Sequence, residues 1–275
     1  MDQTSYKDLF SMVNKTAVVT GGLGILGRRF CAGLAEFGAN VVVVDLEEEK
    51  TKAFAEKLTD RYQTKCMGIA CDVSSPQDVK NMVARVIEAF SDIHILHNNA
   101  AHKSDDLNAF FARFEEYSLA EWRKIMSVNV DGMFLVAQAV GSQMVNQGKG
   151  GSIIQTSSIY GMLGPDQRIY EGSSYLGWEI NTPAVYTASK AAVIGLTKYL
   201  ATYWSNKNIR VNTLTPGGNE SGQNNTFKKK YSGRIPLGRM GKPDEMVAAL
   251  IYLASDASSY VTGQNIIVDG GLSAW

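Results

Sequence analysis

The sequence predicts an α/β fold, in which helices cover both faces of a doubly wound parallel sheet of about seven strands. Short apolar strands alternate with amphipathic helices along the chain, which is the pattern of a parallel sheet. A glycine run follows the first strand and opens the first helix, so that this helix can pack closely on the sheet. The chain has 275 residues, of which 45% are hydrophobic, enough for one large core. We therefore expect a single domain over residues 1–275.

Seven short segments have strand character. The first, Lys15 to Thr20, is rich in Val and Thr, and the second is the uninterrupted run Val41 to Val44. Runs of β-branched residues are typical of parallel strands that are buried on both faces. We expect strands at residues 15–20, 41–44, 67–70, 93–97, 152–156, 209–214 and 265–268.

The segments between the strands repeat apolar residues at helical spacing. A helix from residue 25 ends before Gly38, and a helix over 77–90 follows Ser75 and has Pro76 in its first turn. We expect helices at 25–37, 47–62, 77–90, 119–145, 183–204 and 243–253, with Gly132 inside the fourth. Two polar, glycine-rich insertions, 159–183 and 217–235, break the alternation, and we expect them to be functional loops.

Charge and cysteine content exclude several classes of protein. Basic and acidic residues both total 27, so the net charge is zero and no nucleic-acid partner is indicated. Cys31, Cys66 and Cys71 are odd in number and form no C-x-x-C pair, which suits a reducing compartment. We expect a cytoplasmic protein without a membrane segment, because the N-terminus carries charges and no apolar run approaches bilayer length.

Gly22, Gly24 and Gly27 form a G-x-G-x-x-G motif in the strand–turn–helix context that dinucleotide binding requires. We expect Gly22 and Gly24 to give a tight turn that admits a pyrophosphate, and Gly27 to let the helix approach the sheet. The positive end of that helix would then face the phosphates. The fold is therefore expected to be of the Rossmann type.

The residue at the end of the second strand indicates which dinucleotide is bound. Asp45 stands there, and a carboxylate in that place accepts hydrogen bonds from the adenosine ribose and repels a 2′-phosphate. The run Glu47 to Glu49 adds to this repulsion, whereas Arg28 and Arg29 could reach a phosphate. We expect NAD as the cofactor rather than NADP.

Tyr186 and Lys190 stand four residues apart on a predicted helix, so both side chains share one face. A free phenol titrates near pH ~10, and a nearby ammonium lowers that pKa toward the range useful for acid–base chemistry. Ser157 and Ser158 end the fifth strand, at the sheet edge where a bound nicotinamide would lie. The pattern predicts hydride transfer with a tyrosine as general acid or base.

The ordered motifs from residue 15 to residue 272 resemble those of the short-chain dehydrogenase/reductase family. The matching residues are Thr20-Gly21 with the glycine run, Asp72-Val73, Asn98-Asn99-Ala100, Asn129, Ser158, Tyr186 with Lys190, Pro216-Gly217, and Val261-Thr262-Gly263 to Val268-Asp269-Gly270-Gly271. The resemblance implies an oxidoreductase that acts on secondary alcohols or ketones, and a homotetramer or homodimer.

The resemblance also implies a role for each matching residue. Tyr186 would be the acid/base, Lys190 would lower its pKa and hold the nicotinamide ribose, Ser158 would bind the reacting oxygen, and Asn129 would hold a relay water. The residues implied in cofactor binding are Gly21, Leu23, Gly24, Ile25, Leu26, Asp45, Asp72, Val73, Asn99, Tyr186, Lys190, Pro216 and Gly217. No metal site is implied.

Two departures from the family pattern concern the site. Ile25 stands where the family has glycine, and we expect Gly22 and Gly24 to compensate by a shifted turn. Ser158 and Tyr186 are 28 residues apart, more than is usual, so the interval holds an insertion. Tyr170 and Tyr175 lie in it, but neither has a lysine four residues on, so we assign them to substrate contact or loop packing.

The insertion is similar to that of a subgroup found in flagellin-modification and surface-polysaccharide gene clusters, which implies a sugar-type substrate. The insertion also contains Trp178, and Tyr and Trp faces suit sugar rings, while amides satisfy sugar hydroxyls. Candidate contacts are Asn181, Asn219 and Gln167, and Lys228 to Lys230 with Arg234 could meet a phosphate, although a solvated loop face is the simpler interpretation of these basic residues. His102 and Lys103 follow the Asn98-Asn99 strand end, where a substrate contact is also conceivable.

Several alternatives stay open. The substrate could be an apolar ketone or an acyl-thioester, although the polar insertion argues against an apolar pocket. The protein could be an NAD-retaining epimerase, for which Glu171 or Glu179 would supply a further acid–base group, or a non-catalytic NAD(H) sensor. A metal site at His94, His97 and His102 is not favoured, because His94 and His97 face opposite sides of a strand.

Overall fold

A computed structural model describes residues 5–104 and 106–275 of the chain. The strands of the central sheet are β1 (Thr16–Thr20), β2 (Asn40–Asp45), β3 (Cys66–Ala70), β4 (Ile95–Asn98), β5 (Gly151–Thr156), β8 (Ile209–Pro216) and β9 (Asn265–Val268). All seven are parallel, in the order β3-β2-β1-β4-β5-β8-β9, so the direction of strand order reverses between β1 and β4. The predicted doubly wound parallel sheet is confirmed.

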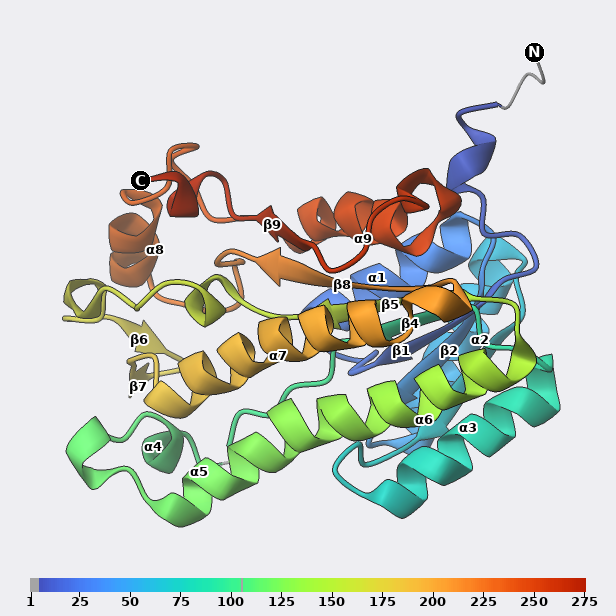
Figure 1. Ribbon diagram of the computed structural model, residues 1–275. Coiled ribbons are helices and arrows are strands. Elements are labelled where there is room, and N and C mark those ends of the chain that lie inside the picture. The colour runs from blue at the N-terminus through green and yellow to red at the C-terminus, as the bar shows by residue number, and fades with distance from the viewer. Residues whose placement is uncertain (1–4, 105) are drawn as a thin grey trace.

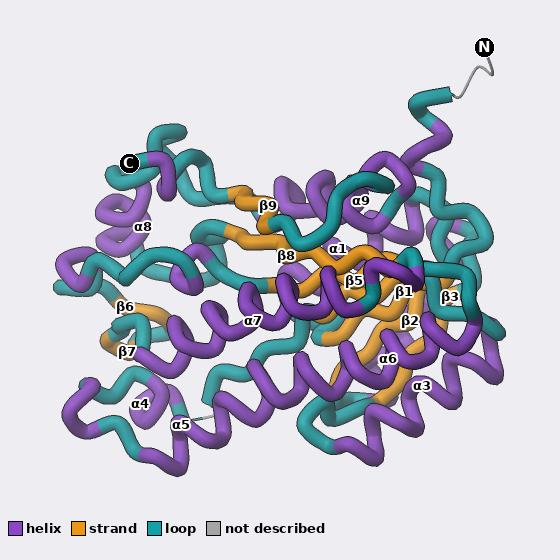
Figure 2. Tube along the Cα trace, viewed as in Figure 1, coloured by secondary structure: helices purple, strands orange, loops and turns teal. Residues whose placement is uncertain are grey.

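Helices cover both faces of this sheet. The α-helices of the described residues are α1 (Ile25–Glu36), α2 (Glu48–Tyr62), α3 (Pro76–Phe90), α4 (Leu107–Phe110), α5 (Leu119–Met126), α6 (Met133–Gln147), α7 (Ala184–Tyr203), α8 (Asn225–Ser232) and α9 (Val247–Ala254). Figure 1 shows α3, α6 and α7 in front of the sheet, with α1, α2 and α9 behind it. Figure 2 shows the strands as one layer between these helices.

Two apolar layers, one on each face, form the core. Val42 and Val44 of β2 point to the layer under α3, α6 and α7, whereas Val41 and Val43 point to the layer under α1, α2 and α9. All four valines are fully buried, as expected for an inner parallel strand. Each buried valine contributes about 1.5–3 kcal/mol to folding, so both layers depend on this alternation.

The long helical stretch predicted over 119–145 is not continuous. A π-helical segment, Ser127–Gly132, separates α5 from α6. Gly132 is required here because a Cβ would lie 2.8 Å from Cγ2 of Val73. The π-helical segment therefore lies close to the loop after β3, at the end of the sheet that carries the site.

The expectation that no apolar run approaches bilayer length is corrected. The stretch Leu119–Gln147 is 29 residues long, with a mean hydropathy of 1.2 in its apolar window, and by length and composition alone it could cross a membrane. In the structure 44% of that window is buried, and α6 packs on β4, β5 and α3. A core helix passes the same test, which makes the composition weak support for a membrane segment.

The two insertions are not plain loops. The first forms an antiparallel hairpin of β6 (Ser174–Tyr175) and β7 (Trp178–Glu179), and the second contains the unpredicted helix α8. The two pack together around a separate apolar cluster of buried Ile159, Ile169, Phe227, Tyr231, Ile235, Met240 and Leu272. We call residues 159–183 and 217–241 together the cap. Figure 1 shows the cap and α4 at one end of the molecule, the end toward which the β8 arrow points.

Hydrogen bonds join the two halves of the cap. The backbone N–H of Asn224 donates to the carbonyl oxygen of Ser174, at 3.1 Å, and the Lys230 ammonium donates to that of Glu171, at 2.6 Å. Arg234 pairs with Asp166, with 3.5 Å between Nε and Oδ2. Segments about fifty residues apart in sequence therefore form one unit.

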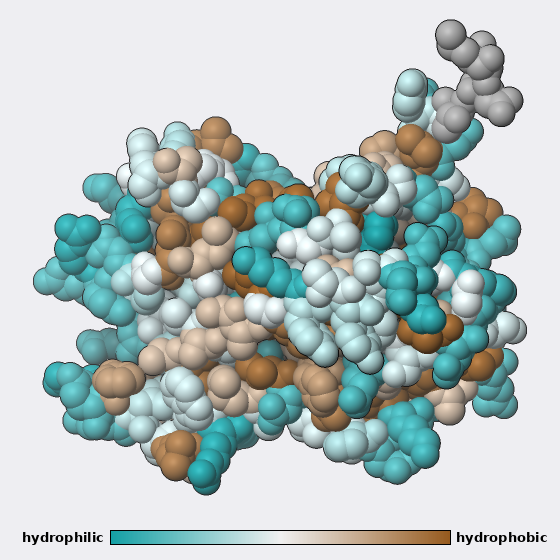
Figure 3. Space-filling view, in the orientation of Figure 1, coloured by the Kyte–Doolittle hydropathy of each residue, from teal (hydrophilic) through white to brown (hydrophobic). Residues whose placement is uncertain are grey.

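The sheet ends in an edge strand that is only partly covered. On the face drawn in Figure 3, hydrophilic and neutral residues predominate, and apolar residues gather over β9. Ile267 of β9 is 36% exposed. The expected homotetramer or homodimer stays a prediction.

Because α6 packs closely on the end of α7, we expect one methyl group added at this contact to lower the stability of the fold. A Cβ on Gly141 would lie 2.1 Å from the Trp204 ring, so Gly141→Ala should lower the free energy of unfolding by about 1–3 kcal/mol, despite the better helix propensity of alanine. Gly164→Ala is the control, because its added Cβ would meet no atom within 4 Å. Urea unfolding of both variants checks this, and equal stabilities would contradict the packing described.

Candidate active site

A large cleft opens at the carboxyl ends of the strands, between the sheet and the cap. Its volume is about 1080 Å³. Its walls come from the loops after β1, β2, β3, β4, β5 and β8, and from the cap. Ligands of open parallel sheets bind at this edge, where the strand order reverses. The cleft extends across the sheet edge from the loop after β3 to the loop after β8, so it can hold an extended molecule.

The loop after β1 is built from glycines that no other residue could replace. Gly21 has a φ of +64° and a Cβ on it would lie 2.9 Å from Cα of Ala100. A Cβ on Gly27 would lie 2.0 Å from the carbonyl oxygen of Gly21. The turn therefore needs Gly21 in addition to the predicted glycines: a Cβ on Gly22 would lie 2.8 Å from Cγ1 of Val43, and Gly27 brings α1 close as predicted.

This glycine loop is held against the end of β4. The Thr20 hydroxyl accepts hydrogen bonds from the backbone N–H groups of Asn99 and Ala100, at 2.9 and 3.1 Å. The Asn99 amide donates to the carbonyl oxygens of Thr20 and Gly21, at 3.2 and 3.4 Å. The loop is thereby fixed with the first turn of α1 facing the cleft. Free backbone N–H groups and the helix dipole there suit a pyrophosphate.

Asp45 is the last residue of β2 and lies at the sheet edge beside the glycine loop. Its two carboxylate oxygens accept hydrogen bonds from the backbone N–H groups of Leu23 and Leu46, both at 2.9 Å. Each oxygen keeps a further lone pair for a ligand hydroxyl. The neighbouring arginines are engaged elsewhere: Arg28 donates to the Leu23 carbonyl oxygen and stacks on Phe54, and Arg29 pairs with Asp244, at 3.4 Å.

Tyr186 and Ser158 meet at the middle of the cleft. Tyr186 lies in the first turn of α7 and Ser158 follows β5, and their hydroxyl groups share a hydrogen bond. Burial raises the pKa of Tyr186 above its ordinary value, and the bond from Ser158 only partly opposes this. The phenol is therefore neutral at neutral pH and able to donate a proton.

Lys190 lies one helical turn further along α7 and is almost fully buried. Its ammonium donates to the carbonyl oxygen of Thr156, at 3.0 Å, and lies 6.0 Å from the centroid of the Tyr186 ring. Burial lowers the pKa of Lys190 to about 8. The expectation that Lys190 lowers the pKa of Tyr186 does not hold in this arrangement, because burial dominates and the opposing bond comes from Ser158.

Asn129 does not line the cleft. It is fully buried in the π-helical segment, where its side-chain oxygen accepts a hydrogen bond from the backbone N–H of His102, at 2.7 Å. Its amide nitrogen lies 3.4 Å from the hydroxyl of Ser189. Asn129 therefore joins the loop after β4 to α7, close behind the cleft wall.

The other residues that the family resemblance assigns to catalysis or cofactor binding all line the cleft. The remaining cofactor-binding predictions, Leu23, Gly24, Ile25, Leu26, Asp72, Val73, Pro216 and Gly217, are all among its walls. Asp72 accepts hydrogen bonds from the backbone N–H and hydroxyl of Ser74, at 2.9 and 2.7 Å. The structure thus brings together residues that are up to 196 positions apart in sequence.

The cap supplies walls that the sequence did not predict. The hydroxyl groups of Tyr160 and Tyr170 lie 3.4 Å apart, and Tyr170 also bonds Thr182, so the insertion places a hydroxyl network beside Tyr186. Further unpredicted lining residues in the cap are Ile180, Pro183, Gly218, Ser221, Gln223, Phe227, Tyr231 and Met240, and outside it they include Phe110, Phe111, Lys124, Ser127 and Val128. An Asp–Leu start signal for α4 and an Asn–Asn–Thr signal for α8 were the only local hints.

Only some of the predicted substrate contacts and alternative acid–base groups line the cleft. Asn181, Asn219, His102, Lys103, Tyr170 and Tyr175 are among its walls, but Gln167, Glu171, Trp178, Glu179, Arg234 and the lysines at 228–230 are not. His97 bonds Thr156 at 2.8 Å in the core, and burial lowers its pKa to about 3. No group of three or more metal-ligating side chains occurs within residues 5–104 and 106–275.

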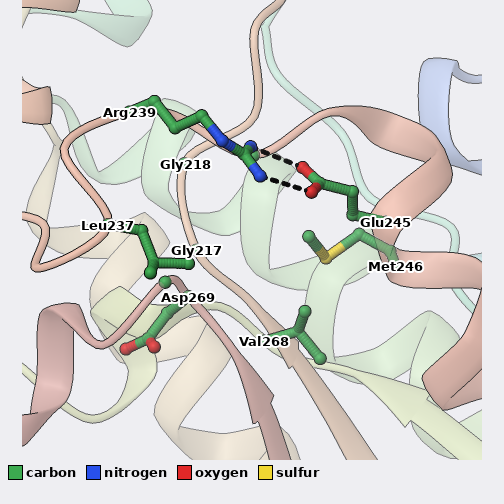
Figure 4. Close-up of a pocket in the computed structure, with 10 residues that line it drawn as sticks. Gly217, Gly218, Leu237, Arg239, Glu245, Met246, Val268 and Asp269 are labelled. Atoms are coloured by element: carbon green, nitrogen blue, oxygen red, sulfur yellow. Dashed lines mark hydrogen bonds and ion pairs between the residues drawn. The ribbon is translucent and has the colours of Figure 1, made fainter.

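A second, small cavity of about 90 Å³ lies behind the loop after β8, lined by Gly217, Gly218, Leu237, Met246, Val268 and Asp269 among others (Figure 4). Beside it, Arg239 makes two bonds to the carboxylate of Glu245, at 2.7 and 2.6 Å. The backbone N–H of Gly241 donates to the Gly218 carbonyl oxygen at 2.9 Å. These contacts close the second half of the cap at its base.

Comparisons with known proteins identify the family of this chain. The family model described as enoyl-(acyl carrier protein) reductase matches residues 24–273. The chain is 34% identical to a sorbose reductase of Candida albicans, over 96% of this chain and 89% of the relative. It is also 34% identical to a 3-oxoacyl-[acyl-carrier-protein] reductase of Chlamydia muridarum, over 95% of this chain and 98% of the relative.

Solved structures share the fold as well. A gluconate 5-dehydrogenase of Burkholderia cenocepacia, in complex with NADP and tartrate, has a TM-score of 0.86 and 32% identity, covering 98% of both chains. A short-chain dehydrogenase of Leptospira borgpetersenii with bound NAD+ has a TM-score of 0.84 and 31% identity, covering 99% of this chain and 97% of that one. With its Rossmann-type sheet, its cleft and these relatives, the chain belongs to the short-chain dehydrogenase/reductase family of NAD(P)-binding oxidoreductases.

Proposed function

We propose that this protein is an NAD-dependent oxidoreductase that interconverts a secondary alcohol and a ketone on a polyhydroxylated, sugar-type substrate. The observation that carries the proposal is the meeting of Ser158, Tyr186 and Lys190 in the same cleft as the glycine loop and Asp45. An acid–base group, a cofactor cradle and a ribose-binding carboxylate are thus aligned along one sheet edge.

Tyr186 is the acid/base in this proposal. In ketone reduction its neutral phenol donates a proton to the carbonyl oxygen, and in alcohol oxidation the deprotonated group accepts the hydroxyl proton. Ser158 binds the same oxygen and keeps it within reach of the phenol. Bound nicotinamide would supply or accept the hydride at the adjacent carbon. Because burial raises the pKa of Tyr186, the neutral phenol that reduction requires predominates at neutral pH.

The remaining residues bind and orient. The N-terminus of α1 and the glycine loop would hold the pyrophosphate, Asp72 and Val73 the adenine, and Lys190 the nicotinamide ribose. Pro216 and Gly217 would border the carboxamide. Asn99 and Asn129 act as positioning residues through the contacts that fix the glycine loop and the His102 segment. That Asn129 also holds a relay water stays a prediction.

NAD is favoured over NADP by the surroundings of Asp45. Its carboxylate is oriented by two backbone N–H groups, which leaves lone pairs for the ribose hydroxyls. A 2′-phosphate would meet this negative charge, and the two nearby arginines, Arg28 and Arg29, are already engaged by Phe54 and Asp244. Relatives with either nucleotide are known, so the choice rests on this chain's own residues.

The polar cap walls favour a sugar-type substrate. Asn181, Asn219 and Gln223 line the cleft together with the Tyr160–Tyr170 hydroxyl network. The resemblance of the insertion to the flagellin-modification subgroup, and relatives named for sorbose and gluconate, point the same way. A second candidate is a 3-oxoacyl-thioester reductase, which the apolar walls Phe110, Phe111 and Met240 would accommodate and the carrier-protein reductase relatives suggest.

An epimerase and a non-catalytic sensor are less favoured. Glu171 and Glu179, the extra acid–base groups that an epimerase could use, do not line the cleft. The sensor hypothesis predicts loss of a catalytic group, yet Ser158, Tyr186 and Lys190 are all in place.

Removing the phenolic hydroxyl group tests the proposed function. Tyr186→Phe should lower kcat for oxidation of a polyol such as threitol or glucitol by about 10²–10⁴-fold, because the proton acceptor is lost, and NAD affinity should stay nearly unchanged. Tyr260→Phe is the control, because Tyr260 is fully exposed. Rates from NADH absorbance and NAD binding by calorimetry check both parts. A variant with wild-type turnover would remove Tyr186 from the acid–base role.

Cofactor choice is tested at Asp45. Asp45→Ala should lower the ratio of kcat/KM for NAD to kcat/KM for NADP by about tenfold or more, since hydrogen bonds to a charged group contribute about 1.5–3 kcal/mol. Glu56→Ala is the matched control, because Glu56 lies on the exposed side of α2 and outside the acidic run Glu47 to Glu49. An unchanged ratio in Asp45→Ala would place the ribose elsewhere.

The buried ammonium of Lys190 lowers the stability of the fold, and the proposed mechanism needs it. We therefore expect its replacement to raise stability and abolish activity. Its pKa is about 8 in the folded chain and 10.5 ordinarily, so below pH 8 the buried ammonium opposes folding by roughly 3 kcal/mol, and this cost vanishes as the pH rises past 10.5. Lys190→Met should therefore be about 1–2 kcal/mol more stable at pH 7, after loss of the Thr156 bond, and inactive.

The stability gain of Lys190→Met should shrink as the pH rises from about 7 to about 9.5. Thermal unfolding over that range measures it, with Lys198→Met, on the exposed side of α7, as the control. A Lys190→Met protein that is less stable than the parent at neutral pH would show that the ammonium stabilises the fold.

A further inference from the structure

We propose that the cap end of the cleft holds a subsite for a negatively charged group on the substrate, a carboxylate or a phosphate, and that Lys103 binds it. The substrate would then be an acidic polyol. This inference rests on the proposed function, because it concerns the same cleft, and it names a substrate class that the catalytic residues alone do not define.

Lys103 lies where it can reach such a group. It follows β4 at the same sheet edge as Ser158 and Tyr186, and it lines the cleft with them. Its ammonium lies 4.7 Å from the centroid of the Tyr175 ring, which belongs to β6 of the cap. The lysine side chain therefore spans from the sheet to the cap, over the space that a substrate must occupy.

The charges along the cleft are segregated. Among the described residues that line it, the carboxylates are Asp45 and Asp72, which end β2 and follow β3 at the adenosine end. At the cap end Lys103 lines the cleft, and Lys190 lies deeper in it. A positive field at the cap end attracts an anionic group and disfavours a cationic one.

Within the described residues, no carboxylate neutralises the positive charge of the Lys103 ammonium. It is reachable by water through the open cleft, yet protein surrounds it closely enough that burial lowers the pKa of Lys103, and no described carboxylate acts in the opposite direction. The ammonium lies over the face of the Tyr175 ring, which is uncharged. An anion bound beside it would form a charge-assisted hydrogen bond in a partly desolvated place, where such bonds are strong.

Two buried polar atoms nearby call for a hydroxyl-bearing molecule. The amide nitrogen of Asn181 donates to the Phe111 carbonyl oxygen at 2.6 Å, so the orientation of the amide is fixed and its oxygen is left without a partner. Nε2 of the adjacent His102 is also buried without a partner. The Asn181 oxygen can only accept, so a donor such as water or, with substrate bound, a sugar hydroxyl satisfies it.

The competing explanation is that Lys103 merely ties the cap to the sheet through Tyr175. A tether would stabilise the closed cleft for every substrate alike, whatever its charge. A charge-binding subsite acts only on anionic substrates. Matched substrates that differ in charge but not in carbon skeleton therefore separate the two.

The experiment compares D-gluconate and D-glucitol 6-phosphate with neutral D-glucitol, all with NAD, in the intact protein and in Lys103→Gln and Lys103→Arg. We expect the parent protein to prefer one of the anions by tenfold or more in kcat/KM. Lys103→Gln should remove that preference and leave glucitol oxidation within about twofold, and Lys103→Arg should keep most of it. Lys228→Gln, whose lysine pairs with Glu220 outside the cleft, is the matched control.

The outcomes separate this inference from the proposed function. Two results would contradict the subsite: an equal loss of kcat/KM for charged and neutral substrates in Lys103→Gln, or a preference of the parent protein for glucitol. Neither result would contradict the proposed polyol oxidoreductase activity. If none of the three compounds is oxidised, the proposed function fails. The subsite is then tested by binding of gluconate and glucitol to the enzyme–NADH complex, measured through NADH fluorescence. Gluconate binding no tighter than glucitol would then contradict it. Whichever anion is preferred identifies carboxylate or phosphate.

Discussion

The close contact between the first turn of α1 and the glycine loop is the constraint on which the rest of the structure depends. Gly27 and Gly21 approach so closely that no side chain fits between them, and Thr20 fixes the loop to the end of β4 through two backbone N–H groups. This contact sets where the helix dipole points and leaves the carboxyl edge of the sheet open. The cleft, its acidic ribose end and its cap follow from that opening.

Burial of polar groups at this edge is the second organising feature. Lys190, nearly inaccessible to water, has one carbonyl partner, and Tyr186 is held neutral by its surroundings. Such groups oppose folding, so the two apolar layers on the sheet must compensate for them. Their arrangement makes chemical sense once a ligand fills the cleft, because the same desolvation strengthens every interaction with the reacting oxygen.

Local pattern was enough to predict the sheet and the central residues, and distance in sequence explains what it missed. The spacing of Tyr186 and Lys190 on α7 and the run Val41–Val44 are properties of single segments. The cap is not: its two halves join through contacts such as Asn224 to Ser174, and α8 has too few apolar residues to stand out alone. The direction of the Tyr186 pKa shift depended on packing around the phenol, which no spacing reveals.

The measurement that tests the account most directly is the initial rate of NAD and NADP reduction by the unaltered protein, over neutral polyols, their carboxylates and phosphates, and 3-hydroxyacyl thioesters. The account predicts NADH formation from a polyhydroxylated alcohol, with NAD preferred over NADP. Turnover confined to the thioesters would contradict the substrate class while leaving the catalytic residues in place. Binding of NAD without turnover of any alcohol would contradict the central claim that this cleft performs hydride transfer.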